Sequence, residues 1–61
     1  MYPLLRRIER YLRFSGTPPT KFGREALRDP RLVFDLRNGR RPGPTTIRRV
    51  TAHLDRLEQE Q

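Results

Sequence analysis

The 61-residue chain contains no cysteine and a single histidine. Without cysteine it can form no disulfide, offers no thiol nucleophile and cannot build a zinc finger. Its serine and threonine residues stand near expected helix ends and turns, and no pair of carboxylates is placed in an evident pocket. We therefore expect no enzyme, no metal and no other cofactor or small-molecule ligand. His53 is expected to be a surface or helix-packing residue rather than a metal ligand.

Long apolar runs are absent as well. No stretch approaches the ~20 apolar residues that a membrane-spanning helix needs. The opening segment Met1-Tyr2-Pro3-Leu4-Leu5 is followed at once by Arg6 and Arg7, so it is too short for the core of a signal peptide. We expect a cytoplasmic protein without a membrane segment. The length and the starting methionine suggest one complete small domain over residues 1–61.

Acidic residues are few beside basic ones, seven against fourteen, which gives a net charge of +7. Residues 1–49 hold thirteen basic and four acidic residues, a net +9, whereas residues 50–61 hold one basic and three acidic, a net −2. Thirteen of the basic residues are arginine, whose forked donors suit phosphate and guanine. This balance indicates a nucleic-acid partner, with the acidic end facing away from it. The alternative is an arginine-rich solvated surface without such a partner.

A first helix is expected over residues 4–14, because apolar residues recur there every three or four positions. Ser15-Gly16 should end it. Its basic side either contacts phosphate or is a solvated surface in which Glu9 pairs with Arg13, and for Arg6 and Arg7 we favour the solvated surface. The apolar stripe consists of Leu4, Leu5, Ile8, Tyr11 and Leu12.

A last helix is expected over residues 45–59, capped by Thr45 or Thr46. Its apolar residues are spaced three, four and three apart, a seam too short for a coiled coil on its own. We expect this helix to close the core against the first one and its far end to meet a second copy. The residues expected at that dimer contact are Val50, Leu54 and Leu57.

Two short helices, residues 18–27 and 30–37, are expected at the centre of the chain. Each begins with a capping residue followed by proline, Thr17-Pro18 in the first and Asp29-Pro30 in the second. Asn38-Gly39 should end the second, because glycine accepts the left-handed conformation found after helices. No strand is expected, so the fold class is all-α.

The second central helix has two different sides. Arg31, Phe34 and Asp35 share the outer one, as a DNA-reading helix-turn-helix requires. Phe34 either contacts a thymine methyl group or packs at the domain edge or in a dimer. Asp35 either pairs with Arg31 or accepts a hydrogen bond from a cytosine amino group. The inner side consists of Leu32, Val33 and Leu36.

Small and apolar residues through this centre follow the pattern of a known family. An apolar residue stands early in the first helix, small residues stand where the two helices cross, and the helix ending is Leu36-Arg37-Asn38-Gly39-Arg40. Residues 17–39 thereby resemble the lambda-repressor/Cro-like (XRE-type) helix-turn-helix family. Leu27 stands where that family usually has glycine, so we expect a corner of different shape. The matching positions are Phe22, Gly23, Ala26, Val33 and Leu36.

The resemblance implies a small four-helix, lambda-repressor-like domain that binds double-stranded DNA as a homodimer on a partly palindromic operator. It implies a transcriptional regulator, more often a repressor than an activator, that is nucleoid-associated when bound. The expected base contacts are Arg28, Arg31, Phe34 and Asp35. The expected DNA backbone contacts are Pro19, Thr20, Lys21, Arg37, Asn38, Arg40 and Arg41.

Two other functions stay open. One is a protein-interaction module, such as an antitoxin or a phage-encoded adaptor, which a large exposed apolar patch around Phe34 would favour. The other is a non-specific RNA or nucleoid binder, which equal competition by RNA and random DNA would favour. RNA is the weaker candidate because few aromatic residues are present for stacking. The connector 40–44 is either beside the DNA backbone or an exposed linker.

Overall fold

Four α-helices and their short connections account for residues 3–60, the part of the chain that this computed structural model describes. The helices are α1 (Pro3–Ser15), α2 (Pro19–Leu27), α3 (Leu32–Arg37) and α4 (Pro44–Gln59). The expectation of an all-α fold with four helices is confirmed. None of the four helices is both long and apolar enough to cross a membrane.

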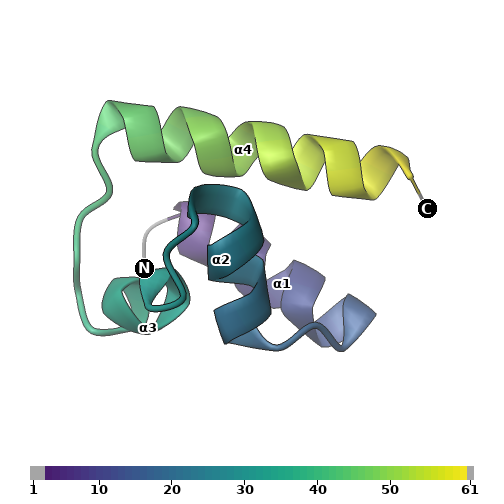
Figure 1. Ribbon diagram of the computed structural model, residues 1–61, viewed down its shortest axis with the longest axis horizontal. Helices are drawn as coiled ribbons and strands as arrows, with labels where there is room; N and C mark the ends of the chain where they lie inside the picture. The colour runs from purple at the N-terminus through teal and green to yellow at the C-terminus, as the bar shows by residue number, and fades with distance from the viewer. Residues whose placement is uncertain (1–2, 61) are drawn as a thin grey trace.

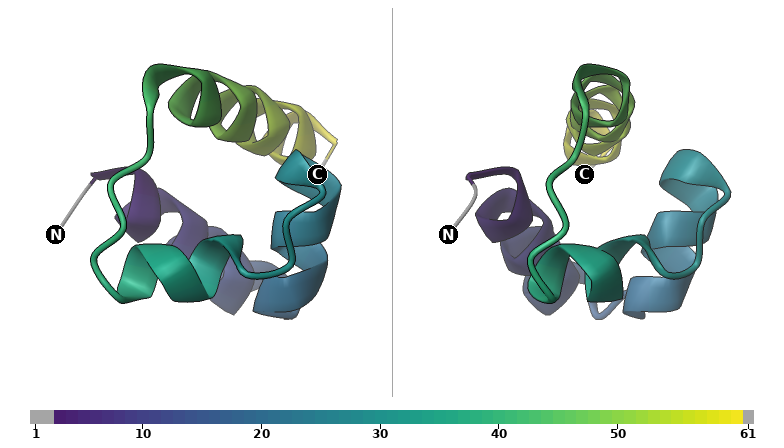
Figure 2. Two further views of the ribbon diagram at one scale, coloured as in Figure 1. Left: turned by 60° about the vertical axis from the view of Figure 1, so that its left-hand side comes forward. Right: turned by 90° about the vertical axis from the view of Figure 1, so that its left-hand side faces the viewer.

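The longest helix, α4, lies across α1 and α2 (Figure 1). It packs against α1 and α2, and Figure 2, in its right-hand view almost along α4, shows it above the space between them. Helix α3 packs against α2 and α1 on the side away from α4, and residues 38–43 climb from its end to the start of α4. Consequently α3 and the corner before it form a surface that α4 does not cover.

Each helix contributes side chains to one core, and the apolar stripes predicted from sequence point into it. Ile8, Phe22, Val33 and Leu54, one residue from each helix, expose 1% or less of their surface. A six-residue helix such as α3 is too short to be stable alone in water. Its stability therefore comes from packing, because Leu32, Val33 and Leu36 are all buried in this core.

Proline, rather than threonine, sets the start of two helices. Helix α2 begins at Pro19, one residue later than expected, with Pro18 at the cap position and no side-chain cap bond. Thr17 instead shares hydrogen bonds with Ser15. Helix α4 begins at Pro44, so Thr45 and Thr46 lie inside its first turn and neither caps it. Proline fits the first helical position because its φ is already helical and its missing N–H would have no partner there.

Helix α3 begins two residues later than expected. The Asp29 carboxylate accepts a hydrogen bond from the Arg31 N–H at 3.0 Å, and the Asp29 carbonyl accepts one from the Leu32 N–H at 3.1 Å. Residues 29–32 are therefore a turn stabilised by Asp29, and α-helical bonding starts with the Asp35 N–H donating to the Arg31 carbonyl at 2.8 Å. Asp29 caps this turn and not the helix itself.

The corner between α2 and α3 has a left-handed residue, and that residue is Arg28, with φ 57° and ψ 31°. Its N–H donates to the Arg24 carbonyl, and the Asp29 N–H donates to the Gly23 carbonyl, which closes the end of α2. Leu27, which stands where the resembled helix-turn-helix pattern usually has glycine, stays helical and packs half-buried against the core. The left-handed position, which usually belongs to glycine, thus lies one residue further along.

Gly23 lies where α2 meets this corner. A Cβ atom at Gly23 would collide with the backbone carbonyl oxygen of Asp29 and would lie 3.1 Å from the Cβ of Leu32. The expectation of a close approach at Gly23 is confirmed, with the turn before α3 as the nearest neighbour.

Candidate nucleic-acid interface

The outer side of α3 exposes two of the four expected base contacts. Arg31 is exposed at the residue before the helix, and Phe34 exposes 41% of its surface three residues later. Residues three apart on a helix share one side, so a guanidinium and an aromatic ring stand together there. Arg28 is also exposed, at the corner that leads into α3. Arg28 and Arg31 form no ion pair with any residue between positions 3 and 60.

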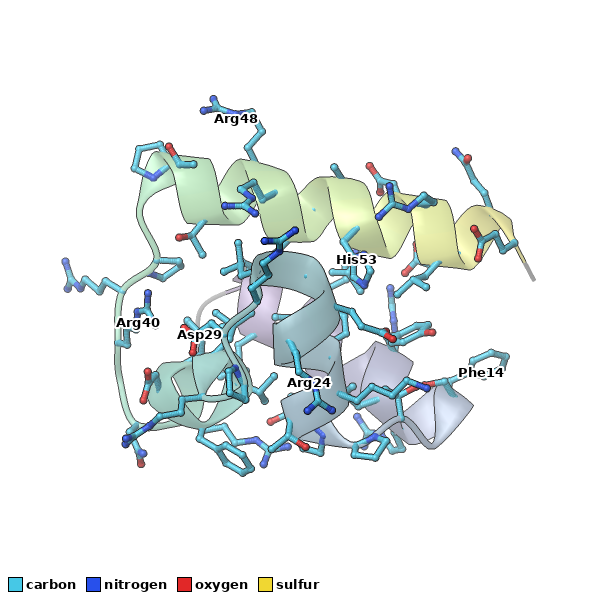
Figure 3. The ribbon with its side chains drawn as sticks, in the orientation of Figure 1. Phe14, Arg24, Asp29, Arg40, Arg48 and His53 are labelled. Atoms are coloured by element: carbon cyan, nitrogen blue, oxygen red, sulfur yellow. The ribbon has the colours of Figure 1, made fainter. Side chains whose placement is uncertain are left out.

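Asp35, the fourth expected base contact, is half-buried and already paired. Its carboxylate lies 3.3 Å from Nη1 of Arg40, and the same nitrogen lies 3.2 Å from the Asp29 carboxylate. Figure 3 shows Arg40 beside Asp29 at the corner. Asp35 thus pairs with Arg40 and not with Arg31, as one of the two alternatives had it. The reason is that Gly39, at φ 100°, turns the chain back so that the Arg40 N–H donates to the Asp35 carbonyl at 2.9 Å.

Arg37, one of the expected phosphate contacts, is exposed and makes a two-bond ion pair with Glu9 of α1, at 2.8 Å from Nε and 2.7 Å from Nη2. Hydrogen bonding to Arg37 lowers the pKa of Glu9, and the same contact raises the pKa of Arg37. The Arg37 guanidinium also lies over the Phe34 ring, 5.7 Å from its centroid. Glu9 thus pairs with Arg37 and not with Arg13 as one alternative had it.

The remaining expected backbone contacts flank α3. Thr20 and Lys21 are exposed at the start of α2, and Asn38 and Arg41 are exposed after α3. Neither Lys21 nor Arg41 has an ion-pair partner in the described chain. Pro19 is half-buried at the first position of α2 and has no N–H with which to bind phosphate.

Arg24 is a candidate contact that the sequence analysis missed. It is exposed on α2, three residues after Lys21 and four before Arg28, and Figure 3 shows it directed away from the core. We call Lys21, Arg24 and Arg28 the α2 basic ridge. Their spacing of three and four was visible in the sequence and would have identified the ridge. Arg48, in contrast, projects from the outer side of α4, away from α3 (Figure 3).

The expected dimer contacts on α4 require a correction. Val50 and Leu54 expose none of their surface, because the apolar side of α4 packs against α1 and α2. A side chain that is already fully buried in one protomer cannot contact another without unfolding. Leu57 is half-buried against the same core.

His53 is buried, and it is a packing residue. Its ring meets the edge of Phe22 at a centroid distance of 5.5 Å, and its Nδ1 lies 3.2 Å from the Arg56 guanidinium. Because Arg56 donates to Nδ1, the ring proton is on Nε2, which is buried without a hydrogen-bond partner among the described residues. Burial lowers the pKa of His53. Residues 3–60 contain no group of three or more histidine, aspartate or glutamate side chains that could hold a metal ion.

Comparison with known proteins finds no protein-family model, no curated protein and no solved structure that matches this chain.

Proposed function

We propose that the protein binds double-stranded DNA with sequence preference through α3 and the α2 basic ridge, as a lambda-repressor-like helix-turn-helix regulator of transcription. One observation carries the proposal. Helix α3 buries Leu32 and Val33 completely while Arg31 and Phe34 stay exposed on its outer side, on a surface that α4 leaves uncovered. A helix held by its inner side and exposed along its outer side can enter a major groove.

The two exposed side chains suit two different base edges. The Arg31 guanidinium can donate two parallel hydrogen bonds to N7 and O6 of guanine, and the Phe34 ring offers apolar contact to a thymine methyl group. We no longer assign Asp35 a base contact, because its carboxylate is paired with Arg40. The proposal therefore narrows the readers on α3 to Arg31 and Phe34.

We assign the phosphate contacts to exposed cations that flank α3 and form no ion pair within residues 3–60. These are the α2 basic ridge on one side of α3 and Arg41 on the other. Thr20 and Asn38 can add hydrogen bonds to phosphate oxygens from the same two sides. The net charge of +7 steers the whole domain toward a polyanion.

A homodimer on a partly palindromic operator remains part of the proposal. Because Val50 and Leu54 are buried in one protomer, pairing has to use another surface, and we propose that it is weak in the absence of DNA. In this proposal, repression follows from occupancy of the operator.

The arrangement of exposed apolar residues favours this function over a protein-interaction module. Within the described chain, Phe14 and Phe34 are the large apolar side chains that are exposed. Figure 3 places Phe14 at the end of α1, and α3, which carries Phe34, lies toward the opposite end of the molecule. Two separated rings are not the contiguous apolar patch that marks a protein-binding site.

Selection of bound fragments from a random duplex library tests the proposal. We expect an enriched motif that contains guanine and thymine. On the enriched site, the logarithm of affinity should fall with the logarithm of salt concentration with a slope of about −7, as eight phosphate contacts per dimer, four from each protomer, would give. No enrichment together with equal displacement by RNA and random DNA would show a non-specific binder, and a slope near zero would exclude DNA binding.

A further inference from the structure

Three carboxylates border α3, and each is paired with an arginine from the end of that helix or just beyond it. Arg37 binds Glu9 of α1, while Arg40 binds Asp29 before the helix and Asp35 within it. Free carboxylates at this surface would repel DNA phosphates, so their neutralisation matters for a nucleic-acid interface.

Arg40 ties together both ends of α3. Asp29 precedes the helix, Asp35 lies inside it, and the Arg40 guanidinium bridges their carboxylates from the residue after Gly39. The Asp29 carboxylate also accepts the Arg31 N–H, so the same group that Arg40 holds fixes the backbone of a proposed base reader. Together, these two contacts of Asp29 hold the backbone in place at the start of α3.

Arg37 fixes the rotation of α3 relative to α1. Two parallel hydrogen bonds to Glu9 are a directional contact, because the planar guanidinium and the carboxylate must align. The guanidinium so fixed lies over one face of the Phe34 ring. The other proposed base reader is thereby oriented from α1.

We propose that Arg37 and Arg40 are positioning residues of the DNA-reading surface and not phosphate contacts. They hold α3 in one orientation and offset the negative charge of Glu9, Asp29 and Asp35, so that Arg31 and Phe34 read the bases. This inference rests on the proposed DNA-binding function. It also predicts how fast the α3 amides exchange in the free protein. That measurement needs no DNA, so it can fail or succeed independently of the proposed function.

The DNA experiment is a cycle of variants around Arg40, measured on the preferred site. Arg40→Ala should lower affinity about tenfold, because two unpaired carboxylates then face the phosphates. In the background Asp29→Asn/Asp35→Asn, which keeps the side-chain shapes and the oxygen that accepts the Arg31 N–H, the same change should lower affinity less than about threefold. Arg40→Lys, which keeps the charge, should recover most of the loss.

Arg41→Ala is the matched control, since Arg41 is the neighbouring exposed arginine without an ion-pair partner in the described chain. It should flatten the salt slope by about one unit, as the loss of a phosphate contact does, and its effect should be the same in both backgrounds. Arg40→Ala should leave the slope unflattened. An Arg40→Ala effect that is equal in both backgrounds and flattens the slope by one unit would show that Arg40 is a phosphate contact.

Amide hydrogen exchange of the free protein tests the positioning role without DNA. Arg40→Ala should speed the exchange of the α3 amides relative to the core amides of α4, and Arg41→Ala should not. Thermal melting in parallel checks that each variant stays folded. If the α3 amides of Arg40→Ala exchange at the wild-type rate, Arg40 does not position α3, whether or not the protein binds DNA. If their exchange is faster but the protein binds no duplex, Arg40 still positions α3 and only the proposed DNA-binding function is excluded.

Discussion

The α4 side of the molecule and the α2–α3 corner differ in how much of their side-chain surface is used in contacts within the protein. On the α4 side, Val50 and Leu54 are fully buried, and Arg7 of α1 binds Asp55 at 2.6 Å and Glu58 at 2.8 Å. At the corner, Arg28 holds a left-handed backbone conformation and Arg31 is exposed without an ion-pair partner in residues 3–60. Strained backbone and unpaired charged side chains lower stability, and in proteins they are found most often at functional surfaces.

The acidic residues sharpen the same difference. In the chain end that carries net negative charge, Asp55 and Glu58 are paired with Arg7, which joins α4 to α1. At the corner Asp29 and Asp35 are paired as well, but with Arg40, which also shapes the proposed reading surface. One side of the molecule is thus a support that needs no partner, and the other is arranged to meet one.

The largest expected effect is on the supporting side. Leu54→Ala should cost about 3 kcal/mol of unfolding free energy, because it leaves a cavity in the core. Leu57→Ala, at a half-buried position of the same helix, is the matched control and should cost clearly less. Denaturant unfolding measures both. If Leu54→Ala keeps the stability of the wild-type protein and changes only its oligomeric state in sedimentation, Leu54 lies in a dimer contact and not in the core.

The second effect is at the corner. Gly23→Val should cost about 2–3 kcal/mol, since its side chain would press against the Asp29 carbonyl oxygen and the Leu32 side chain. Ala52→Val, on the exposed side of α4, is the control and should cost only about 0.5 kcal/mol through helix propensity. Thermal melting compares them, and an unchanged melting temperature for Gly23→Val would show that the corner is more open than described.

A smaller effect should have the opposite sign. Arg28→Gly should stabilise the fold by about 1 kcal/mol, because glycine adopts the left-handed conformation at φ 57° without a steric penalty. Arg28→Ala removes the same charge but keeps the penalty, so it should not stabilise. The two variants should weaken DNA binding alike. Chemical denaturation that ranks Arg28→Ala at or above Arg28→Gly in stability would contradict a left-handed corner.

How far the sequence predicts this molecule depends on the range of each contact. Helical spacing correctly identified the buried stripes, including Leu32 and Val33, because periodicity is a local property. The pairs Arg7–Asp55 and Arg37–Glu9 join residues 48 and 28 positions apart, and no local pattern indicates them.

The α4 seam shows a second limit. Apolar residues spaced three and four apart fit a dimer contact and an internal core equally well. Only the position of α1 and α2 beneath α4 decides that Val50 and Leu54 are internal. Prediction of the proposed site had the same limit. Helical spacing predicted that Arg31 and Phe34 are exposed, but it did not predict the ion pair between Asp35 and Arg40.

The smallest effect is a pH dependence on the supporting side. Burial, and then the nearby Arg56 guanidinium, lower the pKa of His53 from its ordinary 6.5, and Glu25 and Glu60 oppose the shift more weakly. The unfolded chain therefore takes up a proton near pH 6.5 that the folded protein does not. Stability should be full above that pH and should decrease as pH falls below it, toward the folded-state pKa.

His53→Leu should remove this loss, because no imidazole then titrates in the core. The Glu9 carboxyl, whose pKa is lowered by Arg37, produces a separate loss that begins only below about pH 4.5. Urea unfolding at pH 7.5 and pH 5.5 isolates the histidine. An equal decrease in the wild-type protein and in His53→Leu would assign the dependence to other groups.

The most direct test of the account asks whether α3 reads bases. Arg31→Ala should cost about 1–3 kcal/mol on the preferred DNA site and much less on scrambled DNA, because a forked guanine contact is lost. Arg41→Ala should weaken binding to both DNAs by similar factors, because it removes only a phosphate contact. Affinities of the two variants on both DNAs, at two salt concentrations, decide the matter. If Arg31→Ala lowers both affinities equally while Arg41→Ala abolishes the preference, the loop after α3 is the reading element and the account is contradicted.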